Sequence, residues 1–352
     1  MQNLPSSMRS IWRFSGGPWG CRMAFSPSST IAWVQILREQ PMDQRAPGEP
    51  IVVSPPNPST QPPHESRALG YGLLFVATII WGINWPVSKW LLHELPPLTL
   101  RGLPGVFSAL ILAGFVLAKG QSLRAPRGEW GKLILYAALM VGFWMGLMGL
   151  SLVHLPASET AILGATIPVW AAGLAWPMLG ERLSMLRIIA IAMAVGGVVL
   201  LMGGDSISVS WEKMPGIAYA LIAALLFALG AVLAKRRPIA IRPLPAAVWQ
   251  IGLGCFPVAL IGILFEHPHF GGMSTLGWLL FGFSTVFQGA IGYACWFAAL
   301  ERLPASTAAV GTLIVPVTGV VASAISLGEP LGIPQIGALL LTVAGVAIAA
   351  RS

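Results

Sequence analysis

The sequence predicts an all-α polytopic membrane protein with ten transmembrane helices, arranged as two inverted five-helix repeats. Three observations support this prediction. Of the 352 residues, 55% are hydrophobic and only 10% are charged, with a mean hydropathy of +0.76, whereas about a quarter of the residues in an ordinary soluble domain are charged. Apolar runs long enough to cross a bilayer follow one another along most of the chain. The second half of the chain also repeats the first.

This composition excludes several classes of protein. Too few charged side chains are present to cover a surface in water, so a soluble enzyme, a nucleic-acid binder and a disordered protein are all disfavoured. We therefore expect a lipid bilayer as the surroundings and no nucleic acid as a partner. The cysteines Cys21, Cys255 and Cys295 show no CxxC spacing, and we interpret them as small buried residues rather than metal ligands.

Residues 1–68 differ from the rest of the chain. Eight prolines lie between Pro41 and Pro63, mixed with Ser, Gln and Asn, and such a segment cannot bury enough apolar surface to fold. We expect a disordered cytoplasmic tail. Two alternatives stay open: the arginine-rich start is also typical of an organellar presequence, and translation from Met23 or Met42 would make the leader a gene-model artefact.

From residue 69 onward, the apolar runs are each about 20 residues long, which is the length that spans a bilayer. They divide the chain into a first repeat at 69–204 and a second at 215–350. Proline and glycine recur inside the runs, and membrane helices tolerate both. The predicted spans are 69–92, 96–118, 133–153, 156–178, 186–204, 215–234, 244–265, 274–299, 304–326 and 331–350.

The charges in alternate loops predict the orientation. The loops after the second, fourth, sixth and eighth spans, and the C-terminus, carry an excess of Lys and Arg, whereas the opposite loops are mostly acidic. By the positive-inside rule, both termini face the cytoplasm of an inner or plasma membrane. The basic residues are Lys119, Arg124, Arg127, Lys132, Arg182, Arg187, Lys235, Arg236, Arg237, Arg242 and Arg351; the acidic ones are Glu94, Asp205, Glu212, Glu266 and Glu329.

An internal repeat is the most informative feature of the chain. The segment Leu155-Pro156-Ala157-Ser158 recurs as Leu303-Pro304-Ala305-Ser306, and 11 of the 29 positions from residue 155 onward match in this register. A unit with five spans leaves the chain on the opposite side of the membrane, so its copy must insert upside down. Inverted repeats of this kind provide two near-equivalent packings, with a substrate site near the midplane between them.

The sequence resembles the drug/metabolite transporter superfamily, and specifically the EamA family, with two EamA-type repeats over residues from about 70 to 350. The resemblance rests on Trp81-Gly82-Ile83-Asn84, Arg101, the Leu-Pro-Ala-Ser segment, Pro168 and Leu179-Gly180-Glu181, together with the second-half copies of the last three. It implies a secondary transporter that exports small metabolites, such as amino acids or related compounds, without ATP hydrolysis or a cofactor.

Two other classes of function stay open. An uncoupled channel or facilitator is also polytopic, and an intramembrane enzyme would need a nucleophile, a metal cluster or an acid–base pair facing a shared cavity. The predicted spans contain no such constellation, so we expect no catalytic residue and no metal site.

Three ionisable residues lie within the predicted spans, namely Lys89, Arg101 and Glu159, and such residues usually face a cavity or a partner. We expect Glu159 to pair with Arg101 or Lys89, because removing one charge would strand the other. The group would then form an extracellular gate, or its cation would receive the carboxylate of a zwitterionic substrate. Alternatively, both cations extend to the outer headgroups and Glu159 caps its own helix.

Polar and aromatic side chains provide the remaining candidates for substrate binding or gating. Asn84 is expected either to contact substrate or to make a structural hydrogen bond across helices. Gln288 and Trp296 are eight positions apart and so lie near one face of a helix. The full set adds Trp85, Trp144 and Tyr293.

Pro168 and Pro316 lie at matching depths and are candidates for paired helix kinks, because proline removes a backbone donor. Such interruptions point to a binding region, and a packing bend is the alternative. Gly142 and Gly146 have GxxxG spacing, which favours packing within the chain and leaves a homodimer open. Glu329 follows a helix-ending glycine and is expected at the start of the next helix.

Overall fold

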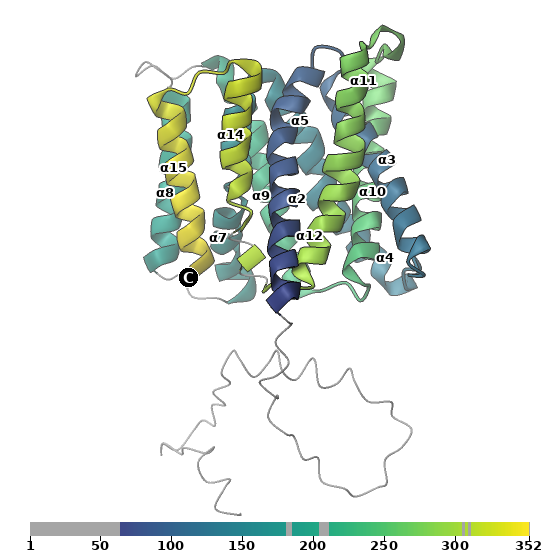
Figure 1. The fold of residues 1–352 in the computed structure, drawn as a ribbon. Helices are drawn as coiled ribbons and strands as arrows, with labels where there is room; N and C mark the ends of the chain where they lie inside the picture. Colours follow the sequence, from purple (N-terminus) through teal and green to yellow (C-terminus); the bar gives the residue numbers. More distant parts are fainter. Residues whose placement is uncertain (1–63, 181–184, 204–210, 305–306, 309–310, 352) are drawn as a thin grey trace, which may run out of the picture. The chain divides into compact units, whose positions relative to one another are not determined.

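The structure is a computed structural model that describes residues 64–180, 185–203, 211–304, 307–308 and 311–351. Throughout this part of the chain, helices are joined by short turns and loops, and they run side by side as one bundle (Figure 1). The predicted tail lies outside the described residues up to residue 63.

The first half of the chain contains two uninterrupted long helices, two interrupted ones and a final helix. The interrupted helices are η3–α4–η4–α5 and α6–α7. The bounds are α2 (His64–Leu91), α3 (Pro97–Ala118), η3 (Arg127–Glu129), α4 (Trp130–Ala137), η4 (Ala138–Gly142), α5 (Phe143–His154), α6 (Ala157–Gly164), α7 (Ile167–Leu179) and α8 (Met185–Gly203).

The second half has the same order of helices. The bounds are η5 (Trp211–Lys213), α9 (Met214–Arg236), α10 (Pro243–Ile261), η6 (Gly262–Glu266), η7 (Phe270–Gly272), α11 (Thr275–Gly282), η8 (Phe283–Ile291), α12 (Gly292–Leu300), α14 (Ile314–Leu327) and α15 (Ile333–Arg351).

Within the described residues, seven helical segments are long and apolar enough to cross a membrane, and three shorter apolar helices accompany them. Each predicted span overlaps one of these segments. The three shorter helices are Ile188–Leu201, Ile314–Leu327 and Ile333–Ile348. Two of them lie within the fifth helices of the two halves, α8 and α15, which are each 19 residues long.

The burial pattern is that of a protein surrounded by lipid. Large apolar side chains are exposed along the helices, among them Phe265, Ile325 and Ile333 at 76% to 88%, whereas the interior contains polar groups. A soluble protein has the opposite tendency. The buried polar and charged residues are Thr78, Asn84, Ser88, Thr99, Arg101, Ser108, Ser151, Ser158, Glu159, Thr160, Thr166, Ser284, Thr285, Ser323 and Thr342.

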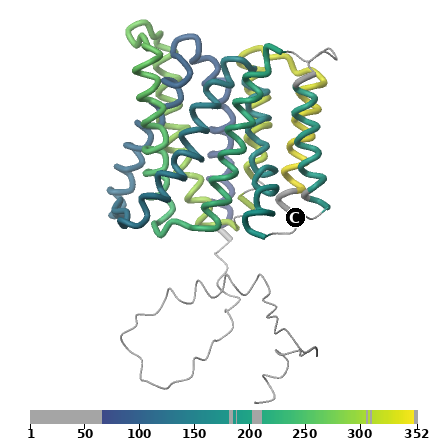
Figure 2. Tube along the Cα trace, turned by 180° about the vertical axis from the view of Figure 1, so that it is seen from behind, coloured from purple at the N-terminus to yellow at the C-terminus, as the bar shows by residue number. Residues whose placement is uncertain are grey.

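The two halves pack against each other in matching pairs, as the two opposite views show (Figures 1 and 2). The second helix of one half, α3, packs on its counterpart α10, and the fifth, α8, packs on its counterpart α15. The first helix of the first half, α2, packs on α12 and α14 of the second, and its counterpart α9 packs on α5 and α7 of the first.

The same pairing holds for individual residues. The first helices of the two halves align at a shift of 146 positions, which matches Gly70 with Gly216 and Trp81 with Phe227. A Cβ added at Gly70 would lie 2.9 Å from Leu303 Cγ, and one added at Gly216 would lie 2.6 Å from Leu155 Cγ. Leu155 and Leu303 are themselves matched in the repeat. Each half therefore places the same kind of side chain against the same helix of the other, which is what a pseudo-two-fold axis requires.

Interruptions occur at matching places in the two halves. π-Helical turns lie at Ala138–Gly142 in η4 and at Phe283–Ile291 in η8, both in the third helix of a half. In the fourth helix, α7 begins at Ile167 after a turn, with Pro168 in its first positions, and α14 begins two residues before Pro316 after a similar turn. π-Helical turns often mark functional sites.

Candidate functional site

Arg101 is the buried charge around which the candidate site is built. It lies one turn into α3 and is only 7% exposed. Its Nη1 donates a 3.0 Å hydrogen bond to Ser88 Oγ on α2, and its Cζ lies 5.7 Å from the centre of the Trp85 ring, within the range of a cation–π contact. The hypothesis that this cation extends to the headgroups is wrong, because the side chain points into the bundle.

A chain of polar side chains continues from Arg101 across the two halves. Asn84 Nδ2 donates to Ser88 Oγ at 3.3 Å, and Ser284 Oγ in η8 donates to Asn84 Oδ1 at 3.1 Å. Asn84 therefore makes the hydrogen bonds that a buried amide in a span needs. Neither Ser88 nor Ser284 was among the sequence candidates, because a serine within an apolar run is not distinctive.

The aromatic candidates form two clusters. Trp85 packs edge-to-face on Trp144 with ring centroids 6.4 Å apart, and Trp144 packs on Phe227 at 5.4 Å. Trp81 packs on Tyr293 at 5.4 Å and on Trp296 at 5.5 Å.

The two clusters are related by the repeat. Trp81 and Phe227 occupy matched positions in the first helices of the two halves, and each packs on an aromatic residue of the third helix of the other half. Trp81 Nε1 also donates to the backbone oxygen of Gln288 at 3.2 Å. Thus Gln288 and Trp296 both contact Trp81, the former through its main chain.

The expected ion pair of Glu159 with Arg101 or Lys89 is wrong. Glu159 is 1% exposed, and its Oε1 accepts from Lys213 Nζ at 2.7 Å and from Gln335 Nε2 at 3.1 Å. Gln335 belongs to the second repeat, and Lys213 lies in η5, directly before the first helix of that repeat. They were missed because Lys213 lies in a loop and Gln335 is a single amide in the last span.

Lys89 is held by main-chain oxygens. Its Nζ donates to Leu152 O at 2.6 Å and Leu155 O at 2.9 Å, where α5 ends. A cation suits the C-terminus of a helix, because the last carbonyls have no partner in the helix and carry partial negative charge. Lys89 thus joins α2 to α5 rather than to a carboxylate.

Three acidic residues cap helices of the other half, at the end of the bundle that is uppermost in Figure 1. Glu329 accepts from the backbone nitrogens of Ala157 and Ser158 at 2.7 and 2.9 Å, at the start of α6. The expectation that Glu329 lies at the start of the next helix is therefore wrong. The expectation that Glu159 caps its own helix is also wrong, because Glu329 takes that place. We call the end of the bundle that contains these caps the capped face.

The other two caps follow the same rule. Glu266 accepts from the backbone nitrogens of Leu98 and Thr99 at 2.9 and 2.8 Å, at the start of α3. Glu94 accepts from the backbone nitrogen and hydroxyl of Ser274, before α11. Carboxylates at helix N-termini satisfy free N–H groups and complement the helix dipole.

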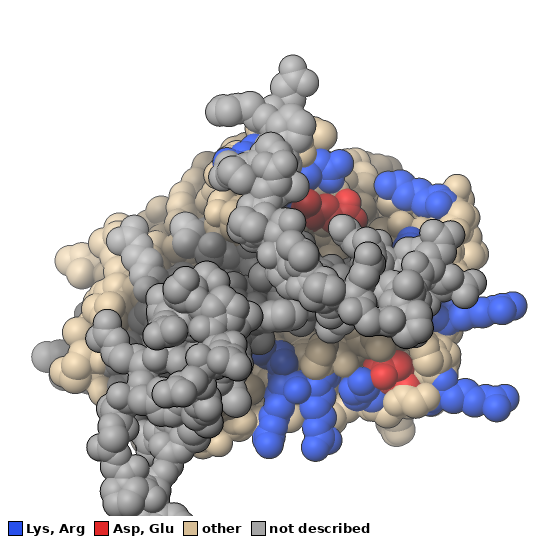
Figure 3. All heavy atoms as spheres, turned by 90° about the horizontal axis from the view of Figure 1, so that it is seen from below, with Lys and Arg blue, Asp and Glu red and all other residues tan. Residues whose placement is uncertain are grey.

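The opposite end of the bundle is rich in Lys and Arg, and Figure 3 shows these side chains around its rim. We call it the basic face. Its described basic residues include Lys119, Arg124, Arg127, Lys132, Lys235, Arg236, Arg237, Arg242 and Arg302. Within it, Glu129 accepts from Lys132 at 2.7 Å and from the backbone nitrogen of Ala240 at 3.0 Å, so one contact here also joins the two halves. Glu181, Arg182 and Asp205, from the predicted loops, lie outside the described residues.

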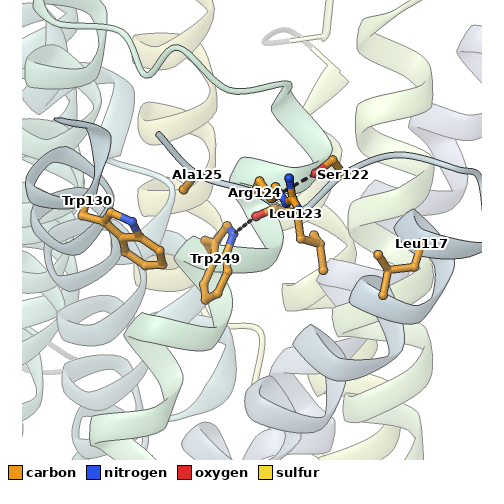
Figure 4. Close-up of a pocket in the computed structure, with 7 residues that line it drawn as sticks. All are labelled: Leu117, Ser122, Leu123, Arg124, Ala125, Trp130 and Trp249. Carbon is orange, nitrogen blue, oxygen red and sulfur yellow. Dashed lines mark hydrogen bonds between the residues drawn. The ribbon is translucent and has the colours of Figure 1, made fainter. Parts of the chain in front are cut away.

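A pocket of about 560 Å³ opens at the basic face beside α3, α4 and α10 (Figure 4). Trp249 Nε1 donates to Leu123 O at 2.8 Å in its wall, and the rings of Trp130 and Trp249 pack edge-to-face. The lining residues are Leu117, Ser122, Leu123, Arg124, Ala125, Trp130 and Trp249. None of the predicted site residues lines this pocket, so it is separate from the Arg101 site.

These observations define a class of protein: a multi-pass membrane protein with two inverted halves and a buried polar and aromatic site between them. The chain belongs to the EamA-like transporter family, whose pattern matches residues 68–203 and again 214–351. Membership of a family of transporters also means that it is not an enzyme.

Individual proteins support the same conclusion. The chain is 30% identical over 303 residues to a probable amino-acid metabolite efflux pump of Salmonella typhimurium, covering 80% of this chain and 95% of the pump. It is 29% identical over 286 residues to the uncharacterized transporter YvbV of Bacillus subtilis, covering 78% and 90%. A solved crystal structure matches with a TM-score of 0.59 and 20% identity, over 81% of this chain and 96% of that one, which shows a shared fold.

Proposed function

We propose that this protein is a secondary transporter that exports small metabolites, such as amino acids or related compounds, by alternating access between its inverted halves. This proposal rests on the packing of equivalent helices of the two halves against each other, α3 on α10 and α8 on α15. Two halves related in this way have two near-equivalent packings, one open to each side of the membrane. The name of the Salmonella relative supports the choice of substrates and the direction.

The contacts at the capped face support a closed state of that side. Glu159 with Lys213, Glu329 with α6, and Glu266 with α3 all join one half to the other. In this proposal they hold the capped face shut and must separate when that side opens. Because each contact is charged and lies at the end of a helix, water entering from that side can replace it.

The distribution of charge supports the orientation. The basic face contains most of the described Lys and Arg residues of the loops, whereas the capped face contains Glu94, Glu266 and Glu329. By the positive-inside rule the basic face lies in the cytoplasm. The capped face would then be the exit, and both termini would be cytoplasmic in an inner or plasma membrane.

Counterflow with purified protein in liposomes tests the proposal. Liposomes loaded with one amino acid are diluted into a trace of the same labelled compound, across the proteinogenic amino acids and their simple derivatives. A carrier accumulates label transiently, and protein-free liposomes are the control. An ohmic current without counterflow would indicate a channel, and no counterflow of any compound would contradict export of this class.

A further inference from the structure

Arg101 differs from the other charges in the predicted spans because no described residue balances it. Glu159 has Lys213, and Lys89 has two carbonyl oxygens. The only hydrogen bond that Arg101 makes to the described part of the chain goes from Nη1 to Ser88 Oγ. Its Nε is buried and has no hydrogen-bond partner.

Such an arrangement is costly unless something else completes it. An arginine side chain stays charged at any pH that a cell experiences, and a buried charge without a partner is strongly destabilising. The cost falls when an anion binds. The edge of the guanidinium formed by Nε–H and Nη2–H makes no hydrogen bond to a described residue, and this pair of parallel donors matches the two oxygens of a carboxylate.

The surroundings hold the guanidinium in one orientation. Ser88 fixes Nη1 and is itself held by Asn84, which is held by Ser284. The Trp85 ring lies beside the guanidinium. On α5, Gly149 lacks a side chain where Arg101 passes: a Cβ there would lie 3.0 Å from Arg101 Cγ. A cation held in place before binding loses little freedom when its ligand arrives.

We propose that Arg101 is the anion-recognition residue of the transport site, and that it binds the carboxylate of the exported metabolite through its Nε–Nη2 edge. The proposal rests on the proposed function and narrows it to compounds with a free carboxylate. The Trp85 ring lies beside the guanidinium and packs on Trp144, which packs on Phe227, so we expect the remainder of the ligand to be apolar or aromatic.

Acid and amide pairs test the proposal on the full-length protein. L-Phenylalanine and L-leucine are each compared with their primary amides, which keep the side chain and amine and lack the anion. In wild-type proteoliposomes we expect the acids to compete in counterflow at least tenfold better than the amides. The same four compounds are compared as stabilisers of the purified protein against heat, which requires no transport.

Variants of Arg101 test whether this residue is the source of the preference for acids over amides. Arg101→Gln should reduce the ratio of competition by acid to competition by amide to about one. Arg101→Lys should retain part of this ratio, because lysine keeps the positive charge but lacks the two parallel N–H donors of the guanidinium. Arg124→Gln, an identical change on the basic face, should leave the ratio unchanged. If Arg101→Gln does not fold, Ser88→Ala keeps the guanidinium but removes the hydrogen bond that orients it, together with the one that Asn84 donates to Ser88, and should reduce the ratio severalfold.

The outcomes separate the two proposals. Counterflow without any acid preference would overturn the role of Arg101 and leave the transporter in place. Heat stabilisation by the acids alone, without counterflow, would keep the carboxylate site and overturn transport. Heat stabilisation by sodium chloride equal to that by the same concentration of the acids, and lost in Arg101→Gln, would show that the site binds inorganic anions, and would overturn carboxylate recognition.

Discussion

Glu159, Lys89 and Arg101 are charged side chains within the bundle, and each has a different set of partners. Glu159 uses a lysine and an amide of the other half, Lys89 uses the free carbonyls at the end of α5, and Arg101 uses one serine and a tryptophan ring. In lipid, an ionisable side chain stays only where such partners exist. The incompletely balanced charge is therefore the one from which a ligand site can be inferred.

The first prediction concerns Glu159 and its repeat counterpart, Thr307. Glu159→Gln removes the anion that Lys213 binds, and we expect a loss of about 1.5–3 kcal/mol in the free energy of unfolding, as for other hydrogen bonds to charged groups. We also expect a severalfold slower counterflow. Thr307→Val is the control at the matched position. The measurements are thermal unfolding in detergent and counterflow in liposomes, and equal behaviour of the two variants would contradict a special role for Glu159.

At the scale of single helices, close approach between α3 and α10 organises the centre of the bundle. Without a hydrophobic force between helices in lipid, contact depends on small residues that let backbones come together. Gly102 on α3 faces the backbone of α10, where a Cβ would lie 2.6 Å from Ala259 Cα. Gly142 likewise faces Gly254, so this glycine of the GxxxG spacing packs within the chain.

The second prediction is made for this helix crossing. Gly102→Ala forces α3 and α10 apart, because a Cβ cannot fit against backbone atoms at that distance. Such overpacking typically costs about 1–3 kcal/mol, and separating two backbones places the effect at the upper end. Gly114→Ala, on the same helix with nothing within 4 Å, is the matched control. The melting temperatures of the two purified variants test this prediction. Similar melting temperatures would contradict it, because they would mean that α3 and α10 can move apart without loss of stability.

At the scale of the whole molecule, the two faces of the bundle carry different charge. Carboxylates at the capped face bind helix N-termini of the opposite half, whereas Lys and Arg gather at the basic face (Figure 3). The inverted repeat brings loops from both halves to each face. Consequently, a conformational change that moves one half against the other must break charged contacts at the face that opens.

The third prediction concerns orientation. In a background in which Cys21, Cys255 and Cys295 are replaced, Gly271→Cys on the capped face and Gly128→Cys on the basic face each provide one open position. We expect a membrane-impermeant maleimide to label Gly271→Cys in intact cells, and Gly128→Cys only after permeabilisation. The reverse pattern would show that the positive-inside rule fails for this chain.

Much of the fold could be predicted because it depends on local properties. Length and hydropathy place each span, and the repeated Leu-Pro-Ala-Ser segment locates the second half. Arg101 and Glu159 could also be found, since charges are rare in spans. Their partners could not: Glu159 binds Lys213 and Gln335 at separations of 54 and 176 positions, and no spacing rule connects residues so far apart.

The sequence by itself determined the all-α membrane fold, the order of the apolar spans and the division of the chain into two inverted repeats. A span in lipid must satisfy its own backbone hydrogen bonds, so its position follows from composition alone. Only the tertiary structure decided which charges meet, and that Arg101 has no anionic partner among the described residues. Those contacts depend on how helices from different halves approach within a few ångströms, and this depends on the packing of small residues such as Gly102 and Gly149 rather than on hydropathy.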